Sequence, residues 1–161
     1  MHIKLRNIQE GDISEIISLA NSCLHVEDHS PFVYWMLSKY FNNITFVAIN
    51  GADNSIVGFV SGVIASNSRK IGYIWQVAVD PTKRRIGIGT KLITKIITEL
   101  QSQQLKGVEF SIDPVNYASK KMILSTFEML GLIVEEKDKF SIHIEEIDWA
   151  ESHQHFLVEF K

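Results

Sequence analysis

A glycine-containing basic turn stands between an apolar run and an amphipathic segment. In this turn Lys83, Arg84 and Arg85 precede Gly87 and Gly89. Glycine lets the backbone approach a ligand closely, and the first turn of a helix has N–H groups without internal partners beside the positive end of the helix dipole. Three consecutive cations oppose that dipole unless an anion is bound. The turn therefore predicts a site for a phosphate-bearing ligand, with a solvated turn as the alternative.

Two common phosphate-binding motifs do not match this turn. A dinucleotide fingerprint needs a third glycine three positions after Gly89, and that position is Leu92. A P-loop has lysine directly after its second glycine and then serine or threonine, whereas Thr90 and Lys91 stand in the reverse order. Both differences argue against a nucleotide-binding protein of either kind.

The pattern Arg84-x-x-Gly87-x-Gly89, preceded by a Val-Ala-Val strand, resembles the acetyl-CoA signature of the GNAT superfamily of N-acetyltransferases. The resemblance extends from Ile44 to Leu132. It implies that the turn binds the pyrophosphate of acetyl-CoA, the cosubstrate, and that the strand before it pairs with the pantetheine arm. The cofactor-binding residues implied in this way are Val77, Val79, Arg84, Arg85, Ile86, Gly87, Ile88, Gly89, Thr90 and Asn116.

Three stretches resemble one branch of that superfamily, the diaminobutyrate acetyltransferases of ectoine synthesis. They read Ser-Pro-Phe-Val-Tyr at 30–34, Trp-Gln-Val-Ala-Val at 75–79 and Asp-Pro-Val-Asn-Tyr-Ala-Ser at 113–119. In that branch the first stretch follows residues that hold the amino-acid substrate, and the second lines the acetyl-transfer site. Here His29 stands where the branch has an asparagine.

The loop before this first stretch carries two adjacent carboxylates that could bind an ammonium group. The expected substrate-binding residues are Glu27, Asp28, Ser30, Tyr34 and Trp75, the last three shaping a small pocket. A solvated acidic loop is the alternative. Since successive residues of a strand face opposite sides of a sheet, we expect only one of Trp75 and Gln76 to line the pocket.

Acetyl transfer requires that the amine lose a proton, because an alkylammonium with a pKa of about 10 cannot attack a thioester. The resemblance places His155 where the branch has a glutamate, and an imidazole suits a general base at neutral pH. An exposed histidine at a strand edge is the alternative. The tyrosine that protonates the leaving thiolate in many GNAT enzymes is replaced by Ile123 or, in another alignment, Phe127. The expected catalytic residues are His155 as base, Trp75 at the transfer site and Glu27 as the alternative base.

Other chemistry is not expected. His25 and His29 stand four apart and His153 and His155 two apart, but no H-E-x-x-H pattern occurs, so we expect no metal site. The lone Cys23 is expected to behave as a small hydrophobic residue.

The periodicity of the apolar residues predicts a mixed α/β chain. Helices are expected after Asp12 as cap, after Ser30, and over 89–101 and 118–130. Strands are expected over 2–7, 44–49, 56–64, 73–79, 108–112, 132–136, 140–147 and 156–160. This order predicts a GNAT-like α+β sheet, antiparallel at one end, with a βαβ crossover in its middle.

Composition limits the partners. The chain has 161 residues, 45% of them hydrophobic, and a formal net charge of −3. We expect a single domain over 1–161, no binding to nucleic acid and no attachment to a membrane. One cysteine suits a reducing compartment, the cytoplasm. The resemblance implies a homodimer.

These observations predict an acetyl-CoA-dependent N-acetyltransferase that acts on the primary amine of a small amino acid, with L-2,4-diaminobutyrate as the favoured acceptor. One alternative is an acyl-CoA-binding sensor without catalysis. Another is an acetyltransferase for a protein amine or an aminoglycoside.

Overall fold

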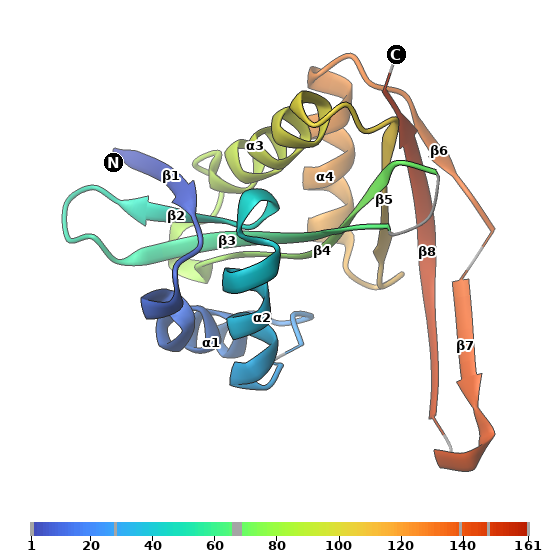
Figure 1. Ribbon diagram of the computed structural model, residues 1–161, viewed down its shortest axis with the longest axis horizontal. Helices are drawn as coiled ribbons and strands as arrows, with labels where there is room; N and C mark the ends of the chain where they lie inside the picture. Colours follow the sequence, from blue (N-terminus) through green and yellow to red (C-terminus); the bar gives the residue numbers. More distant parts are fainter. Residues whose placement is uncertain (1, 28, 66–68, 139, 148, 161) are drawn as a thin grey trace.

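The computed structural model describes residues 2–27, 29–65, 69–138, 140–147 and 149–160. The strands are β1 (Ile3–Asn7), β2 (Phe46–Asn50), β3 (Ile56–Ile64), β4 (Ile71–Val79), β5 (Gly107–Ile112), β6 (Val134–Glu136), β7 (Phe140–Ile144) and β8 (Trp149–Glu159). The helices are α1 (Ile13–Ser22), α2 (Pro31–Tyr40), α3 (Ile88–Ser102) and α4 (Tyr117–Met129) (Figure 1). No helix in these described ranges is long and apolar enough to cross a membrane.

The strands form one mixed sheet in the order β1-β2-β3-β4-β5-β8-β6, and β7 also pairs with β8. The first four strands are antiparallel, whereas β4 and β5 are parallel because α3 carries the chain back across the sheet. This arrangement confirms the predicted sheet with an antiparallel end and a central crossover.

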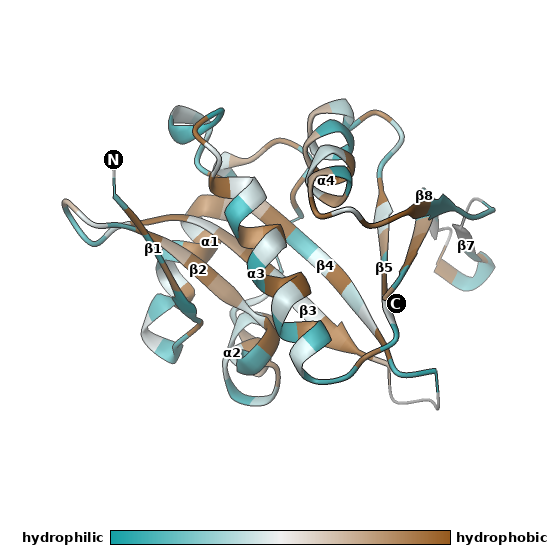
Figure 2. Ribbon diagram, turned by 90° about the horizontal axis from the view of Figure 1, so that it is seen from above, coloured by the Kyte–Doolittle hydropathy of each residue, from teal (hydrophilic) through white to brown (hydrophobic). Residues whose placement is uncertain are grey.

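Helices cover the two faces of the sheet unequally. The apolar stripe of α3, which includes Leu92, Ile93 and Ile96, is fully buried in one core that also contains side chains of α4. A second core lies between α1 and α2 and the opposite face of β2–β4. Figures 1 and 2 show α1 and α2 on this half of the sheet, away from β5 and β8. The face of β5 and β8 that points away from α4 therefore belongs to neither core and can carry polar side chains.

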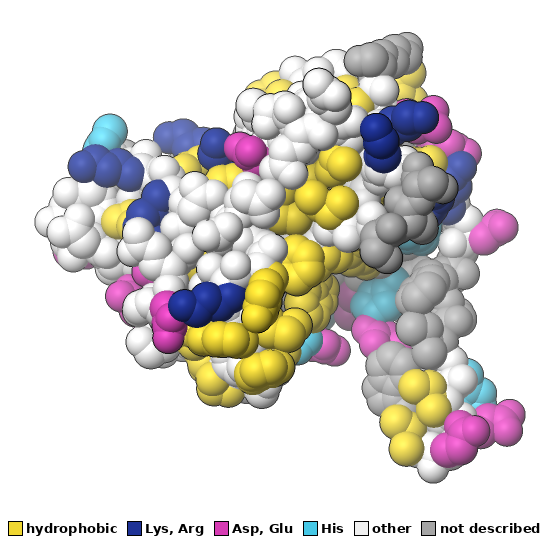
Figure 3. Space-filling model, viewed as in Figure 1, with side chains coloured by type: hydrophobic (Ala, Val, Ile, Leu, Met, Phe, Trp, Pro, Cys, Tyr) yellow, Lys and Arg dark blue, Asp and Glu magenta, His cyan; other side chains and the backbone are white. Residues whose placement is uncertain are grey.

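The last strand is longer than the sequence predicts. β8 begins at Trp149, seven residues before the expected start at Phe156, and β7 ends at Ile144 rather than at Ile147. The early part of β8 is polar, and its strand conformation comes from the ladder with β7 and not from its own propensity. The β7–β8 hairpin projects from the body of the molecule as an arm (Figure 3).

β4 contains a bulge in the middle of its ladder with β3. Ser61 pairs with Gln76 and Gly62 with Ile74, so Trp75 is an extra residue on β4. Such an insertion changes which side of the sheet the neighbouring side chains face.

Asp12 stands at the N-cap position of α1, as the sequence predicts, but its side chain bonds elsewhere. Its side chain makes no capping bond to the helix; it accepts hydrogen bonds from the Gln9 N–H at 2.8 Å and from both terminal nitrogens of Arg6 at 2.6 and 2.7 Å. Burial raises the pKa of the Asp12 carboxyl, but the hydrogen bonds from Arg6 and Gln9 and the charge of Arg6 together outweigh it, and the net pKa lies below its ordinary value. This pair ties β1 to the start of α1.

Candidate active site

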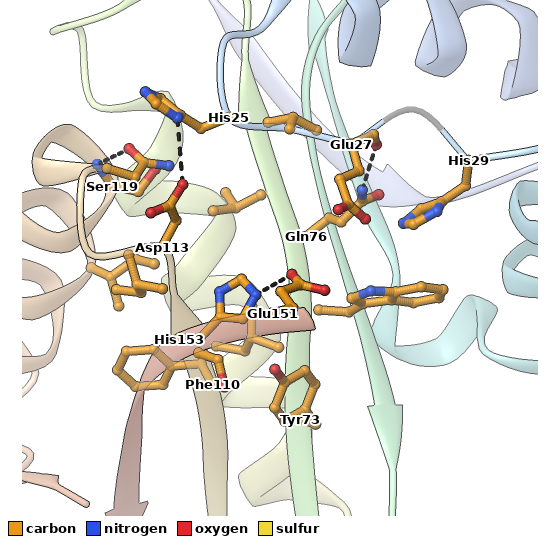
Figure 4. Close-up of a pocket in the computed structure, with 18 residues that line it drawn as sticks. His25, Glu27, His29, Tyr73, Gln76, Phe110, Asp113, Ser119, Glu151 and His153 are labelled. Atoms are coloured by element: carbon orange, nitrogen blue, oxygen red, sulfur yellow. Dashed lines mark hydrogen bonds and ion pairs between the residues drawn. The ribbon is translucent and has the colours of Figure 1, made fainter. Parts of the chain in front are cut away.

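A cavity of about 460 Å³ opens where β4 and β5 separate (Figure 4). The two strands pair only as far as Ile74 and Phe110, while β4 continues to Val79. Beyond Ile74 the edge of β4 that faces β5 offers its backbone groups to a ligand. The cavity is lined by residues from the loop before α2, β4, β5, α4 and β8: His25, Val26, Glu27, His29, Tyr73, Ile74, Trp75, Gln76, Val77, Phe110, Ser111, Ile112, Asp113, Asn116, Ser119, Ile123, Glu151 and His153.

Trp75 and Gln76 both line this cavity. The expectation that only one of them would do so is wrong, because it assumed a regular strand and the bulge at Trp75 interrupts the alternation. Trp75 is 39% exposed, so it lies at the mouth rather than in a core.

Contacts with β4 and with the end of β5 hold the loop before α2 against the cavity. The Gln76 side-chain amide donates a hydrogen bond to the Glu27 carbonyl at 2.8 Å, and the His29 ring lies 4.9 Å from the Trp75 ring, centroid to centroid. The His25 Nδ1 lies 3.7 Å from the Asp113 carboxylate at the end of β5. These contacts bring Glu27 to the cavity, where the sequence predicts it.

Two predicted substrate-binding residues lie outside the cavity lining. Tyr34 is fully buried in the core beneath α2, where its ring packs edge-on against Phe59. Ser30 is exposed at the N-terminus of α2. His29 stands between Tyr34 and the cavity, with ring contacts to both Tyr34 and Trp75. Asp28, the other predicted ligand for the ammonium group, lies outside the described residues.

β8 contributes two polar residues that the sequence analysis missed. Glu151 and His153 line the cavity, and the His153 Nε2 contacts the Glu151 carboxylate (Figure 4). They stand two apart, the spacing that puts both side chains on one face of a strand. An expected strand that began at Trp149 would have revealed this pair.

His155, the predicted base, is not among the residues that line the cavity. It pairs with Ser111 across the β5–β8 ladder, and its Nδ1 lies 3.1 Å from the Ser111 hydroxyl. Ser111 does line the cavity, so His155 reaches the cavity only through its contact with Ser111.

Tyr73 and Ser111 form a further polar part of the wall. Burial raises the pKa of the Tyr73 hydroxyl, an effect that hydrogen bonding to Ser111 reduces. The phenol is therefore neutral throughout the physiological range and can donate or accept a hydrogen bond.

The basic turn lies at the start of α3, outside the cavity lining. Arg85 has φ 64° and Gly87 has φ 83°. Left-handed residues at such positions make successive N–H groups converge, which creates a concavity for anions. Arg84 Nε donates a hydrogen bond to the Val79 carbonyl at 3.4 Å, while Ile86 is 52% exposed beside it.

The other predicted cofactor residues have distinct surroundings. A Cβ at Gly89 would lie 3.1 Å from the Met122 sulfur, so the lack of a side chain at Gly89 serves the packing of α3 on α4. Ile88 is buried in the core, so only its backbone can serve a ligand. Val77 lines the cavity, and Asn116 does so while its side chain caps α4 at the Ser119 N–H. Val79 is partly buried against the core.

The residues at the expected general-acid positions have hydrocarbon side chains, which cannot donate a proton to the leaving thiolate. Ile123 lines the cavity, and Phe127 is fully buried and stacked on Phe110. Within the described ranges, no group of three potential metal-ligating side chains lies together.

Known proteins share both the sequence and the fold. The chain is 34% identical over 127 residues to an L-2,4-diaminobutyric acid acetyltransferase of Nocardia farcinica, covering 79% of this chain and 65% of that protein. It is 34% identical over 104 residues to the protein of the same name from Halomonas elongata, covering 65% of this chain and 54% of that protein. The aligned segments thus span about half to two thirds of the length of these relatives.

The fold closely matches a solved structure. The diaminobutyrate acetyltransferase EctA of Paenibacillus lautus, in complex with its substrate L-2,4-diaminobutyric acid and coenzyme A, superposes with a TM-score of 0.85 at 22% identity. The superposition covers 99% of this chain and 97% of that one. The acetyltransferase (GNAT) family model matches residues 13–127, which include α1, the basic turn and nearly all of α4. With a family match over more than half its length, the chain belongs to the acetyltransferase (GNAT) family.

Proposed function

We propose that this protein transfers the acetyl group of acetyl-CoA to a primary amine of a small amino acid, with L-2,4-diaminobutyrate as the favoured acceptor. The observation that carries the proposal is the separation of β4 from β5 beside a concave basic turn. Similarity to relatives named L-2,4-diaminobutyric acid acetyltransferase supports the acceptor.

Acetyl-CoA would lie along the start of α3 and enter the gap between the strands. The turn of Arg84, Arg85, Ile86, Gly87, Ile88, Gly89 and Thr90 presents its N–H groups and cations to the pyrophosphate. The pantetheine arm would pair with the backbone of Val77 and Val79 near Asn116, which lines the cavity. The thioester carbon then lies in the cavity between β4 and β5.

The acceptor would bind in the outer part of the cavity. Glu27, Asp113 and Glu151 supply carboxylates for the ammonium groups, and Trp75 supplies an aromatic face for a cation. His153, held by Glu151, supplies a ring nitrogen that can face the carboxylate of an amino acid. A cavity that offers both carboxylates and a ring nitrogen suits an amino acid better than a simple amine.

The reaction needs only this cosubstrate and a group that takes the amine proton. The amine nitrogen forms a bond to the thioester carbon, the carbon–sulfur bond breaks, and CoA leaves as a thiolate. A thiolate with a pKa near 8.5 leaves without full protonation, which is compatible with Ile123 and Phe127 at the general-acid positions.

An acceptor panel tests this proposal directly. We expect release of free thiol from acetyl-CoA with L-2,4-diaminobutyrate, and slower release with 1,3-diaminopropane, which has the same spacing between its amines but lacks the carboxylate. Binding of acetyl-CoA without thiol release on any amine of the panel would select the acyl-CoA sensor instead. Preference for a peptide N-terminus, lysine or an aminoglycoside would change the acceptor class.

We also propose a domain organisation, an oligomeric state and a location: the protein is a single-domain homodimer in the cytoplasm. One buried cysteine, Cys23, suits a reducing compartment, and the projecting β7–β8 arm offers a surface to a second copy. Light scattering of the purified protein would give the oligomeric state.

A further inference from the structure

A band of polar side chains leads from the cavity to the surface on one face of the sheet. Tyr73 of β4 is the ladder partner of Glu109 of β5, and Ser111, two residues further along β5, is the ladder partner of His155 of β8. Ladder partners and residues two apart share a face, so all four side chains lie together. Tyr73 and Ser111 line the cavity, whereas His155 lies behind it with 21% of its side chain exposed.

The hydrogen bonds of this band can be assigned donors and acceptors that run in one direction. The His155 Nε2 lies 3.9 Å from the Glu109 carboxylate, which favours a proton on that nitrogen. The His155 Nδ1 is then an acceptor, and the Ser111 hydroxyl 3.1 Å away is its donor. The Ser111 oxygen remains able to accept a hydrogen bond, and Tyr73 lies diagonally across the β4–β5 ladder from it in the same cavity wall. With Tyr73 as the donor to Ser111, the order of donors runs from Tyr73 through Ser111 to His155.

We propose that Tyr73, Ser111 and His155 form a relay that carries the amine proton from the cavity to the surface. This inference rests on the proposed acetyl transfer. The ammonium proton moves to the Tyr73 oxygen as the Tyr73 hydroxyl proton moves to Ser111 and the Ser111 proton moves to the His155 Nδ1. One N–H bond breaks at the acceptor and one forms at the imidazole, so neither hydroxyl becomes charged.

Burial supports a route in which the phenol stays neutral. Because burial raises the pKa of Tyr73, a relay through a neutral phenol costs less than one that leaves a phenolate. The imidazolium formed at His155 is stabilised by Glu109 and then gives its proton to water at the exposed edge. Arg69 holds Glu109 in place through hydrogen bonds of 2.8 and 3.2 Å.

Several charged groups lie around His155 and its end of the relay. Glu109 and Arg69 face it from β5 and from the end of the β3–β4 connection, and Glu151 and His153 lie on its own strand. From the segment after β6, the Lys137 N–H donates to the His155 carbonyl, and the Lys137 ammonium pairs with Glu135.

The test compares variants of the relay in the full-length protein. We expect Ser111→Ala and His155→Gln each to lower kcat about 100-fold while the affinity for acetyl-CoA stays unchanged. The double variant should lose no more than either single variant, because the three groups act as one unit. Ser111→Thr retains a hydroxyl and should restore most of the rate, and added imidazole should rescue His155→Gly. His143→Gln, on the exposed part of β7, is the matched control.

Three outcomes would overturn the relay. One is a parental kcat for Ser111→Ala and His155→Gln from pH 6 to 9. Another is losses that multiply in the double variant. The third is an acetylated Ser111 in the mass of the intact protein, because this would make the serine a nucleophile. All three presuppose an active parent, whereas a parent that transfers acetyl to no amine would contradict the proposed function itself.

Discussion

The basic turn and the acceptor cavity are built in different ways. The turn is one continuous stretch whose proposed ligand contacts are backbone N–H groups, set by the left-handed residues Arg85 and Gly87. The cavity draws side chains from the loop before α2, from β4, β5 and α4, and from the distant strand β8. The turn can therefore be recognised from a short motif, whereas the cavity depends on strand pairings that a motif does not contain.

The largest change is expected from removing a charge in the cavity. Glu151→Gln should raise the KM for L-2,4-diaminobutyrate about 10- to 150-fold, which corresponds to a charge-assisted hydrogen bond of about 1.5–3 kcal/mol. Steady-state kinetics with saturating acetyl-CoA would measure it. Glu145→Gln, in the short helical turn after β7, is the control. An unchanged KM in Glu151→Gln would remove β8 from the acceptor site.

A smaller change is expected in the turn. Gly87→Val places a β-branched side chain at φ 83°, a conformation that costs about 1–2 kcal/mol. Relief of this strain would move the N–H groups, so the affinity for acetyl-CoA should fall about 5- to 30-fold by calorimetry. Gly11→Val, where a side chain meets nothing within 4 Å, is the control. Equal affinities in a folded Gly87→Val protein would exclude the turn as the pyrophosphate site.

The smallest effect on catalysis is expected at the Arg6–Asp12 pair, away from both sites. Asp12→Asn should lower the free energy of unfolding by about 1–2 kcal/mol, because a partly buried charged pair loses one member. Both KM values should stay unchanged. The pKa of Asp12 is lowered in the folded state, so the unfolded chain binds more protons in acid. The stabilisation is therefore present above the ordinary carboxyl pKa and is lost as the pH falls through the folded pKa.

Urea unfolding at pH 7 and in acid would measure this pH dependence. The parent should lose more stability than Asp12→Asn as the pH falls. Parallel losses in the two proteins would show that Asp12 is not the titrating group.

The sequence predicts the regular elements well and the irregular ones poorly. The stripe containing Leu92 and Ile96 correctly gives α3, because one buried face leaves a periodic pattern. The bulge at Trp75 leaves no such trace, since it arises from a register shift against β3. The polar start of β8 is stabilised by β7, so Glu151 and His153 were missed.

The predicted site residues were likewise placed correctly in some segments and wrongly in others. Glu27, Trp75, Val77 and Asn116 line the cavity because they lie in or next to the segments that border the gap. Tyr34 does not, because the helical phase of α2 turns its ring into the core. Large apolar side chains lie on the exposed side of α2 as well as on its buried side, Phe32 and Tyr40 among them, so the pattern of α2 does not specify which face is buried.

A double-mutant cycle with Gly87→Val and Glu151→Gln tests most directly whether one site holds acetyl-CoA and another holds the amine. Initial rates of thiol release, with acetyl-CoA and L-2,4-diaminobutyrate both varied, give the two KM values for each protein. We predict that each single variant changes only its own KM, and that the two free-energy changes add within about 0.5 kcal/mol in the double variant. A single variant that changes both KM values, or a larger coupling, would contradict the account.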